Sequence, residues 1–162
     1  MIVRDALPEE LAEVGEIRVT AYQEAGFLSP GSGYAPVLRE LGGDGAGAVL
    51  VAVDGGRIVG TVMLHLGGNA VAGQGESEIR ALAVTPDGQG KGTGSALLTA
   101  VIERAARDGV RRLVLLTQPD MLAARRLYER AGFRRLPGRD WSPAPGVTLL
   151  AYGLRLGSGV LG

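Results

Sequence analysis

The residues best suited to chemistry in this sequence form a glycine-rich stretch between a predicted strand and a predicted helix. The stretch reads Gln89-Gly90-Lys91-Gly92-Thr93-Gly94-Ser95. Where such a turn enters a helix, several backbone N–H groups have no hydrogen-bond partner inside the helix. Their partial positive charge adds to the helix dipole, so the stretch is predicted to bind an anion, most often a phosphate.

The flanking elements must position this site. Ile79–Val84 is short and mostly apolar, which is typical of a strand, and Thr85–Gly88 follows it. The strand ends there because proline donates no ladder hydrogen bond and Asp-Gly favours a turn. The apolar residues after the stretch recur with helical spacing, at Leu97, Leu98, Val101, Ile102 and Ala105. That spacing predicts a helix with one buried face.

Spacing also separates three kinds of phosphate-binding loop. A Walker loop requires Gly-Lys-Ser/Thr, but the lysine of this stretch is followed by glycine. The dinucleotide fingerprint Gly-x-Gly-x-x-Gly/Ala does not fit either, because its last position falls on Ser95 or Leu97. The pattern that fits is Gln/Arg-x-x-Gly-x-Gly/Ala, as Gln89, Gly92 and Gly94, after a strand that ends Leu-Ala-Val.

This pattern resembles the acetyl-CoA loop of the GNAT superfamily of N-acetyltransferases. A second motif supports the resemblance: residues 124–133 match the family signature Ala-x-x-Leu-Tyr-x-x-x-Gly-Phe, from Ala124 through Tyr128 to Phe133. The chain departs from the family at Met121, where many members have an asparagine. The resemblance implies acetyl-CoA as cosubstrate.

The remaining pattern predicts the element order β-α-α-β-β-β-α-β-α-β-β. The strands are predicted at residues 2–6, 49–53, 57–66, 78–84, 112–116, near 133 and at 147–154, and the other helices at 8–22, 34–41 and 119–132. Trp141–Gly146, which contains two prolines, is predicted as a loop. The order matches the GNAT fold over nearly the whole chain. The expectation is therefore a single N-acetyltransferase domain over residues 1–162. Its α/β (α+β) fold would have a mixed central sheet of about seven strands and helices on both faces.

The resemblance also implies how the cosubstrate binds. The pyrophosphate is expected on the N–H groups of Gln89–Gly94, because a Cβ on Gly92 or Gly94 would hold phosphates away from the backbone. In the family the strand before the loop splays from its neighbour and binds the pantetheine arm. The cofactor-binding residues expected on this basis are Leu82, Ala83, Val84, Gln89, Gly90, Lys91, Gly92, Thr93, Gly94, Ser95, Ala124 and Tyr128.

Two further residues match catalytic positions of the family. Tyr128 matches the general acid that protonates the departing thiolate; the alternative is a half-buried helix tyrosine whose hydroxyl only finds a backbone partner. Glu78 matches a strand glutamate that acts as base; the alternative is a solvated carboxylate paired with an arginine such as Arg80. Glu76 is a second candidate for the base. The function expected is direct acetyl transfer to a primary amine of a small molecule or peptide, and the alternative is a non-catalytic module that binds or senses acyl-CoA.

Composition excludes several other classes. The chain has 162 residues, 17 basic and 17 acidic, so no net charge attracts it to nucleic acid or anionic lipid. It has no cysteine and one histidine, which argues against disulfides, thiolate chemistry and a multi-histidine metal centre. No apolar run approaches the roughly 20 residues that span a membrane. We therefore expect a cytoplasmic protein. The resemblance to the GNAT superfamily leaves two oligomeric states open, a monomer and a homodimer.

Overall fold

The computed structural model describes residues 1–28, 31–67 and 71–157, which fall into two compact units. The first unit is Met1–His65 with Ala81–Val101, and the second unit is Leu66–Arg80 with Ile102–Gly162. The chain passes from one unit to the other three times: after His65, inside the strand β4 (Glu76–Val84) and inside the helix α3 (Thr93–Arg107).

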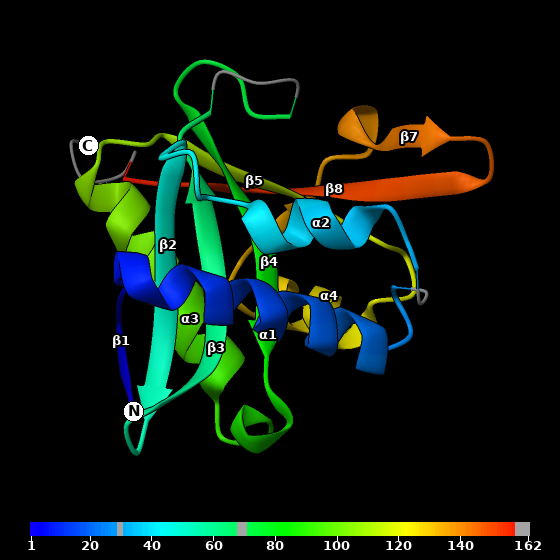
Figure 1. Ribbon diagram of the computed structural model, residues 1–162. Helices are drawn as coiled ribbons and strands as arrows, with labels where there is room; N and C mark the ends of the chain where they lie inside the picture. The colour runs from blue at the N-terminus through cyan, green and yellow to red at the C-terminus, as the bar shows by residue number, and fades with distance from the viewer. Residues whose placement is uncertain (29–30, 68–70, 158–162) are drawn as a thin grey trace. The chain divides into compact units, whose positions relative to one another are not determined.

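The first unit contains three complete strands and the later half of β4. Its other elements are β1 (Ile2–Asp5), η1 (Pro8–Glu10), α1 (Leu11–Glu24), α2 (Tyr34–Glu40), β2 (Gly47–Asp54), β3 (Arg57–His65) and η2 (Pro86–Gly88). β2 pairs antiparallel with β1 and with β3, and the three strands lie side by side (Figure 1). β4 is the next strand of the sheet after β3 and is hydrogen-bonded to it.

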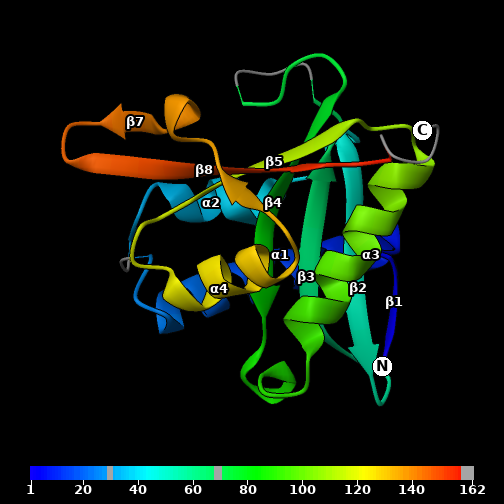
Figure 2. The same ribbon diagram turned by 180° about the vertical axis from the view of Figure 1, so that it is seen from behind.

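Helices cover both faces of the strands in the first unit. On one face, Val14 of α1 packs in a buried cluster with Val51 of β2 and Met63 of β3. On the other face, Gly60 of β3 lies so close to α3 that an added Cβ would be 2.9 Å from Leu97 Cδ1. α3 is seen against this face in Figure 2. The predicted placement of helices on both faces is therefore confirmed in this unit.

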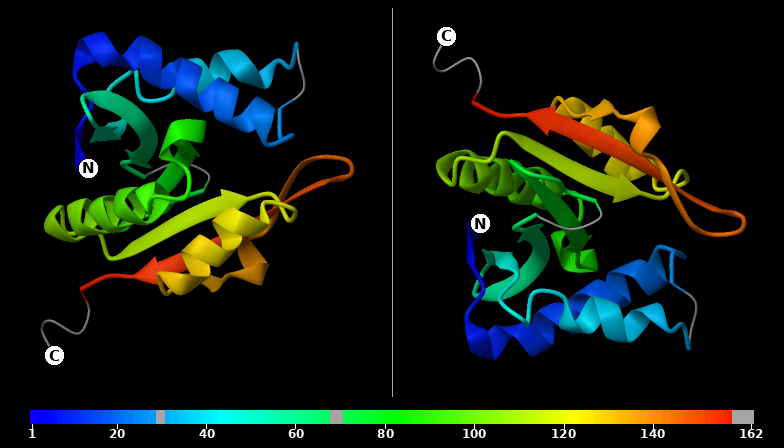
Figure 3. Two further views of the ribbon diagram at one scale, coloured as in Figure 1. Left: turned by 90° about the horizontal axis from the view of Figure 1, so that it is seen from below. Right: turned by 90° about the horizontal axis from the view of Figure 1, so that it is seen from above.

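The second unit contains the first half of β4 and the elements after α3. These are β5 (Arg112–Thr117), α4 (Leu122–Arg130), β6 (Arg134–Arg135), η3 (Pro137–Arg139), β7 (Trp141–Ala144) and β8 (Val147–Arg155). β5 runs parallel to β4 and antiparallel to β8, and β6 and β7 also pair antiparallel with β8. Figure 3 shows α4 alongside β8.

The prediction that Trp141–Gly146 is a loop is wrong. Trp141 pairs with Leu149 and Ala144 pairs with Val147, which makes β7 the first strand of a hairpin. Proline misled the prediction, but an edge strand tolerates it, and the register of β7 is irregular between Trp141 and Ala144, where Pro143 lies. Pro145 and Gly146 form the turn, with Gly146 at a φ of 78°.

The predicted fold class is otherwise confirmed. The described residues contain eight strands and a mixed pattern of pairing, and every predicted strand and helix is present. The organisation as a single domain over 1–162 stays a prediction. Within the described residues, no helix combines the length and apolar character needed to cross a membrane.

Candidate active site

The turn that ends β4 is fixed by short backbone contacts in the first unit. The Thr85 N–H donates to the Val59 carbonyl at 2.9 Å, and the Thr85 hydroxyl accepts from the Gly88 N–H at 3.2 Å. Gly88 packs so tightly on β3 that an added Cβ would be 2.6 Å from the Val59 carbonyl oxygen. Glycine is therefore required at position 88 by close approach, and this packing sets where the glycine-rich loop begins.

Gly90 and Gly92 are required for a different reason. Their φ angles are 74° and 75°, in the left-handed region that side-chain-bearing residues rarely adopt. A Cβ added to either glycine would have no atom of the described chain within 4 Å, leaving aside its chain neighbours. Both glycines thus shape the backbone of the loop and are not needed for packing against the protein.

The loop directs a set of backbone N–H groups away from the protein's own acceptors. In the part of the chain that the structure describes, the N–H groups of Gly90–Gly92 donate to no backbone carbonyl. α3 begins at Thr93, and its first hydrogen bond runs from the Ala96 N–H to the Gly92 carbonyl at 2.9 Å. The N–H groups of Gly90–Ser95 therefore precede the helical ladder and suit an anion.

Two side chains and one backbone N–H of the predicted loop already interact with other groups of the protein. The Gln89 N–H donates to the Pro86 carbonyl at 3.3 Å, so this group is less suited to an anion than its neighbours. The Thr93 hydroxyl is buried and donates to the Gly88 carbonyl at 2.7 Å, so it holds the loop closed. The Lys91 ammonium lies 3.7 Å from Asp54, and both side chains are largely exposed, which makes the ion pair weak.

The strand before the loop contains a feature that the sequence did not signal. Ala81 has a φ of 55° and is the one non-glycine residue with positive φ in the described chain. Such a conformation costs about 1–3 kcal/mol for a residue with a side chain and is commonly found at functional sites. Leu82, Ala83 and Val84 follow it directly, so the residues predicted to bind the pantetheine arm come just after a break in the regular strand.

The second unit holds the other predicted site residues, beginning with Glu78 on β4. Glu78 is 5% exposed, and its carboxylate lies 3.7 Å from the Arg80 guanidinium. It is therefore a buried, paired carboxylate and not a solvated one. The parallel pairing of β4 with β5 ends here, at Glu78 opposite Val114, although β5 continues to Thr117. This early end of the register agrees with the splayed strands that were predicted.

Glu76, the second candidate for the base, is held firmly by arginine. Arg139 donates to both carboxylate oxygens, at 2.7 and 2.9 Å, and Arg112 lies 3.6 Å away. The hydrogen bonds from Arg139 lower the pKa of Glu76 to about 2, outweighing the opposite effect of burial. A carboxylate this acidic is a poor proton acceptor, so the geometry favours Glu78 over Glu76 as a base.

Tyr128 and Ala124 lie on the same face of α4, one turn apart. Tyr128 is 7% exposed and packs against Phe133, with ring centroids 5.8 Å apart. The helix ends at this aromatic pair, because the Phe133 N–H donates to the Tyr128 carbonyl at 3.0 Å and Gly132 takes a φ of 100°. Met121 precedes the helix, and its sulfur accepts a hydrogen bond from the Thr117 hydroxyl at 3.4 Å.

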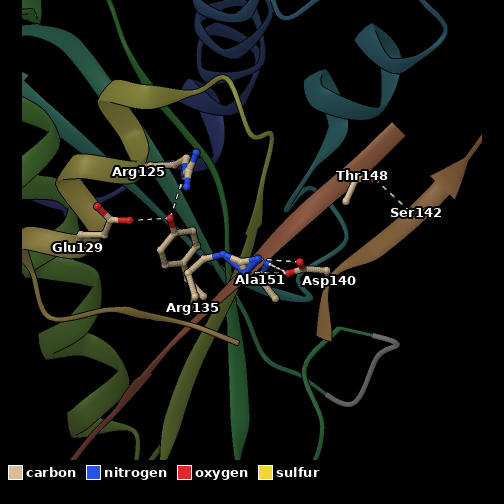
Figure 4. A network of polar contacts seen from close by, with 8 residues as sticks. Arg125, Glu129, Arg135, Asp140, Ser142, Thr148 and Ala151 are labelled. Carbon is tan, nitrogen blue, oxygen red and sulfur yellow. Dashed lines mark hydrogen bonds and ion pairs between the residues drawn. The ribbon is translucent and has the colours of Figure 1, made fainter. Parts of the chain in front are cut away.

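A polar network joins α4 to β8 through Tyr152, which sequence reasoning did not single out. The buried Tyr152 hydroxyl accepts from Arg125 at 3.0 Å and donates to Glu129 at 2.8 Å. Figure 4 shows Arg125 and Glu129 reaching the network from the helix. Arg135 lies over the Tyr152 ring, 5.8 Å from its centroid. These contacts fix the helix that carries Tyr128 against its strand.

Comparison with known proteins agrees with this geometry. The sequence model of the acetyltransferase (GNAT) family matches residues 12–133, which include the loop, Glu78 and Tyr128. The chain belongs to the GNAT family. Members of this family are acetyltransferases that use acetyl-CoA, so the predicted enzyme class and cosubstrate are confirmed at the level of the family.

Individual relatives share the fold or part of the sequence. A mycothiol acetyltransferase from Geodermatophilus obscurus is 37% identical over 94 residues, which are 57% of this chain and 30% of that protein. The chain thus spans about a third of the length of the curated relatives that it matches. A GNAT acetyltransferase structure from Staphylococcus aureus has a TM-score of 0.76 at 19% identity, covering 96% of this chain and 99% of that one.

A third similar protein was solved with the cosubstrate bound. It is a GNAT-superfamily phosphinothricin acetyltransferase from Sinorhizobium meliloti in complex with acetyl-CoA, with a TM-score of 0.72 and 21% identity. The match covers 99% of this chain and 91% of that one. At these identities the structural likeness establishes the GNAT fold and leaves the acceptor open.

The predicted site residues thus form two groups. The first unit brings together Leu82–Val84 and Gln89–Ser95, at the end of β4 and the start of α3. The second unit contains Glu78, Ala124 and Tyr128. The individual roles of these residues in this member of the family stay predictions.

Proposed function

We propose that this GNAT protein transfers an acetyl group from acetyl-CoA directly to a primary amine of a small molecule or a peptide. The observation that carries the proposal is the backbone of Gly90–Ser95. Two left-handed glycines and the start of α3 leave consecutive N–H groups for the pyrophosphate of the cosubstrate. This backbone is joined by the short turn of residues 85–89 to Leu82–Val84, the residues expected to bind the pantetheine arm.

The chemistry needs no covalent enzyme intermediate, because the thioester is already reactive and positioning alone can lower the barrier by several kcal/mol. The amine nitrogen attacks the thioester carbonyl, and a backbone N–H of Leu82–Val84 would stabilise the oxyanion. Glu78 would take the proton from the amine. Tyr128 would give a proton to the thiolate as the carbon–sulfur bond breaks, so that free coenzyme A and the acetylated amine are the products.

The second candidate is a module that binds or senses acyl-CoA without catalysis. Met121 does not separate the two candidates, because a thioether cannot replace the hydrogen bond that asparagine makes to the cofactor in many family members and both candidates bind acyl-CoA. The presence of both Tyr128 and the buried carboxylate of Glu78 favours the enzyme. The curated relatives named mycothiol acetyltransferase support an acceptor amine on a small molecule.

Release of free thiol from acetyl-CoA tests the proposal. The purified chain is given acetyl-CoA and an amine panel that contains small primary amines, aminoglycosides, lysine peptides, peptide N-termini and the acceptor of the mycothiol acetyltransferases. Thiol release that depends on one class of amine supports the enzyme. Tight acetyl-CoA binding in calorimetry with no thiol release from any amine would favour the sensing module. A cytoplasmic location and a homodimer remain predictions that the same preparation and fractionated cells can test.

A further inference from the structure

The second unit contains a cavity of about 270 Å³ that no role has been given so far. Its volume is just below the roughly 300–1,000 Å³ of common ligand pockets, so a small chemical group fits it. Val114 and Leu116 of β5 and Ala151 of β8 form an aliphatic wall, and Trp141 of β7 lines the cavity while remaining 52% exposed. The cavity is thus mostly apolar and is bordered by an aromatic side chain that solvent can reach.

The charged residues at this cavity are occupied by partners within the protein. Arg139 donates to both carboxylate oxygens of Glu76 and, at 2.8 Å, to the Val71 carbonyl. Asp140 accepts from Arg135 through both oxygens and from the Ala151 N–H at 2.8 Å (Figure 4). Each charge is balanced by an opposite one, so the cavity offers little net charge to a ligand. A ligand group with a charge of its own would lose hydration there without gaining a partner.

The cavity lies on the same face of the strands as Glu78. Glu78 is the register partner of Val114, which lines the cavity, and paired residues of neighbouring strands point to the same face. Glu76 lies two residues before Glu78 on β4, so both side chains point to the same face of the strand. Glu76 bonds to Arg139, which lines the cavity, and this contact is a second indication that the face of Glu76 and Glu78 is the one towards the cavity. The carboxylate proposed as the base therefore shares one face of the second unit with Val114 and Leu116 of the cavity wall; Leu115 also lines the cavity.

We infer that this cavity holds the non-reacting part of the acceptor, and that the acceptor is a primary amine on an uncharged aliphatic or aromatic group. The inference rests on the proposed function, because it assumes that Glu78 faces the reacting amine. The apolar group enters beside Trp141 and packs on Val114, Leu116 and Ala151. Acceptors with a carboxylate or a second ammonium on this group are disfavoured.

Binding can be measured separately from catalysis, because Trp141 is the single tryptophan of the chain. Tryptophan fluorescence therefore reports on the surroundings of Trp141, which include this cavity. Titration with 2-phenylethylamine is expected to change the emission in a saturable way, whereas ethylamine, putrescine and β-alanine at the same concentrations are not. Absence of any saturable change with 2-phenylethylamine would overturn the inference, whether or not the protein proves to be an acetyltransferase.

Turnover gives the second measurement. Along the alkylamines from ethylamine to hexylamine, kcat/KM is expected to rise roughly fourfold per methylene until the cavity is full, which corresponds to about 0.8 kcal/mol for each buried methylene. Thiol release from amines without this preference, or a preference for putrescine, would overturn the inference and leave the proposed function standing. If no amine is acetylated, the proposed function fails and the fluorescence titration alone decides on the cavity.

Variants tie the preference to the cavity. Ala151→Leu fills the cavity and should abolish the rise in kcat/KM from ethylamine to hexylamine. Trp141→Ala truncates an exposed side chain and should reduce the preference for 2-phenylethylamine over ethylamine. If Ala151→Leu does not fold, the Trp141→Ala variant tests whether this preference depends on the cavity. Val147→Ala is the control, since Val147 is exposed on the same hairpin outside the cavity lining. An unchanged preference in Trp141→Ala would contradict the inference.

Discussion

The ring of Tyr128 lies against the ring of Tyr152, with centroids 6.3 Å apart and planes inclined by 48°. One tyrosine is the proposed general acid, and the other ties its helix to β8 through Arg125 and Glu129. The two hydroxyls therefore have separable roles, although the rings form a single buried cluster with Phe133. Removing each hydroxyl alone distinguishes catalysis from support.

We expect Tyr128→Phe to lower kcat while acetyl-CoA affinity stays nearly unchanged. Phenylalanine keeps the ring contacts and removes the hydroxyl that is the proposed proton donor. A thiolate leaves fairly well unaided, so the loss should be at the lower end of the roughly 10²–10⁴-fold usual for general acids. Steady-state kinetics with the best amine of the panel, beside calorimetry with acetyl-CoA, provide the measurement.

Tyr152→Phe is the matched control for that change. It removes two part-buried hydrogen bonds between the Tyr152 hydroxyl and charged side chains, so the free energy of unfolding should fall by about 1.5–3 kcal/mol in all. Its kcat should fall much less than that of Tyr128→Phe. Equal losses of kcat in the two variants, or a Tyr128→Phe variant that keeps kcat within about twofold, would remove the acid role from Tyr128.

Gly92→Val is expected to abolish acetyl-CoA binding while the chain still folds. Position 92 has a φ of 75°, and the new side chain would enter the space that a phosphate needs to reach the N–H groups. Gly109→Val is a close control, because Gly109 at the end of α3 has a φ of 78° and equally open surroundings. Both variants should lose similar stability, about 1–3 kcal/mol. Calorimetry should show retained affinity only in Gly109→Val; retained affinity in both would contradict the phosphate role.

Much of this site was predictable from the sequence because its parts are local. The glycine pattern, the proline that ends β4 and the apolar spacing of α3 act over neighbouring residues, and the Ala124–Phe133 motif likewise lies within one helix and its cap. Each of these signals depends on backbone conformation or on one helical face. The structure therefore contains the predicted strand, loop and helices in the predicted order.

Other features depend on contacts that the sequence does not display. Alanine gives no sign of positive φ, so the left-handed Ala81 is set by its surroundings and not by its own preference. The prolines of Trp141–Gly146 indicate a loop, but pairing with β8 makes an edge strand of residues 141–144. The ion pair of Glu76 with Arg139 joins residues far apart in the chain, and Arg139 also lines the cavity.

That ion pair predicts a pH dependence of stability. Hydrogen bonds from Arg139 lower the pKa of Glu76 from 4.5 to about 2 in the folded chain. The ionised carboxylate therefore stabilises the fold above pH 4.5, and this contribution is lost as the pH falls from 4.5 towards 2. Glu76→Gln should be less stable than the wild type at pH 7, and the difference should shrink on acidification. Thermal midpoints measured from pH 2 to pH 7 give the comparison; a difference independent of pH would contradict the pairing.

Glu10 gives an internal comparison for this effect. In the first unit, hydrogen bonds from Arg4 lower the pKa of Glu10 to about 2, so its contribution is lost over the same range of pH. Glu10→Gln should therefore also lose its difference from the wild type on acidification. Glu10 lies outside the predicted site, so only Glu76→Gln, through Arg139, should alter the preference among amines of different size.

Glu78→Gln tests the proposed base through the pH dependence of the rate. If the carboxylate takes the proton from the ammonium form of the acceptor, the variant should be slowest near neutral pH, where little free amine exists. Its rate should approach that of the wild type as the pH rises towards the pKa of the amine, because the free amine no longer needs a base.

The buried contact with Arg80 at 3.7 Å makes a structural role the competing explanation, since glutamine would leave that guanidinium without its charged partner. A structural role predicts a similar loss of kcat at every pH and a lower thermal midpoint. Profiles of kcat/KM from pH 6 to pH 10, measured with thermal midpoints at the same pH values, separate the two roles.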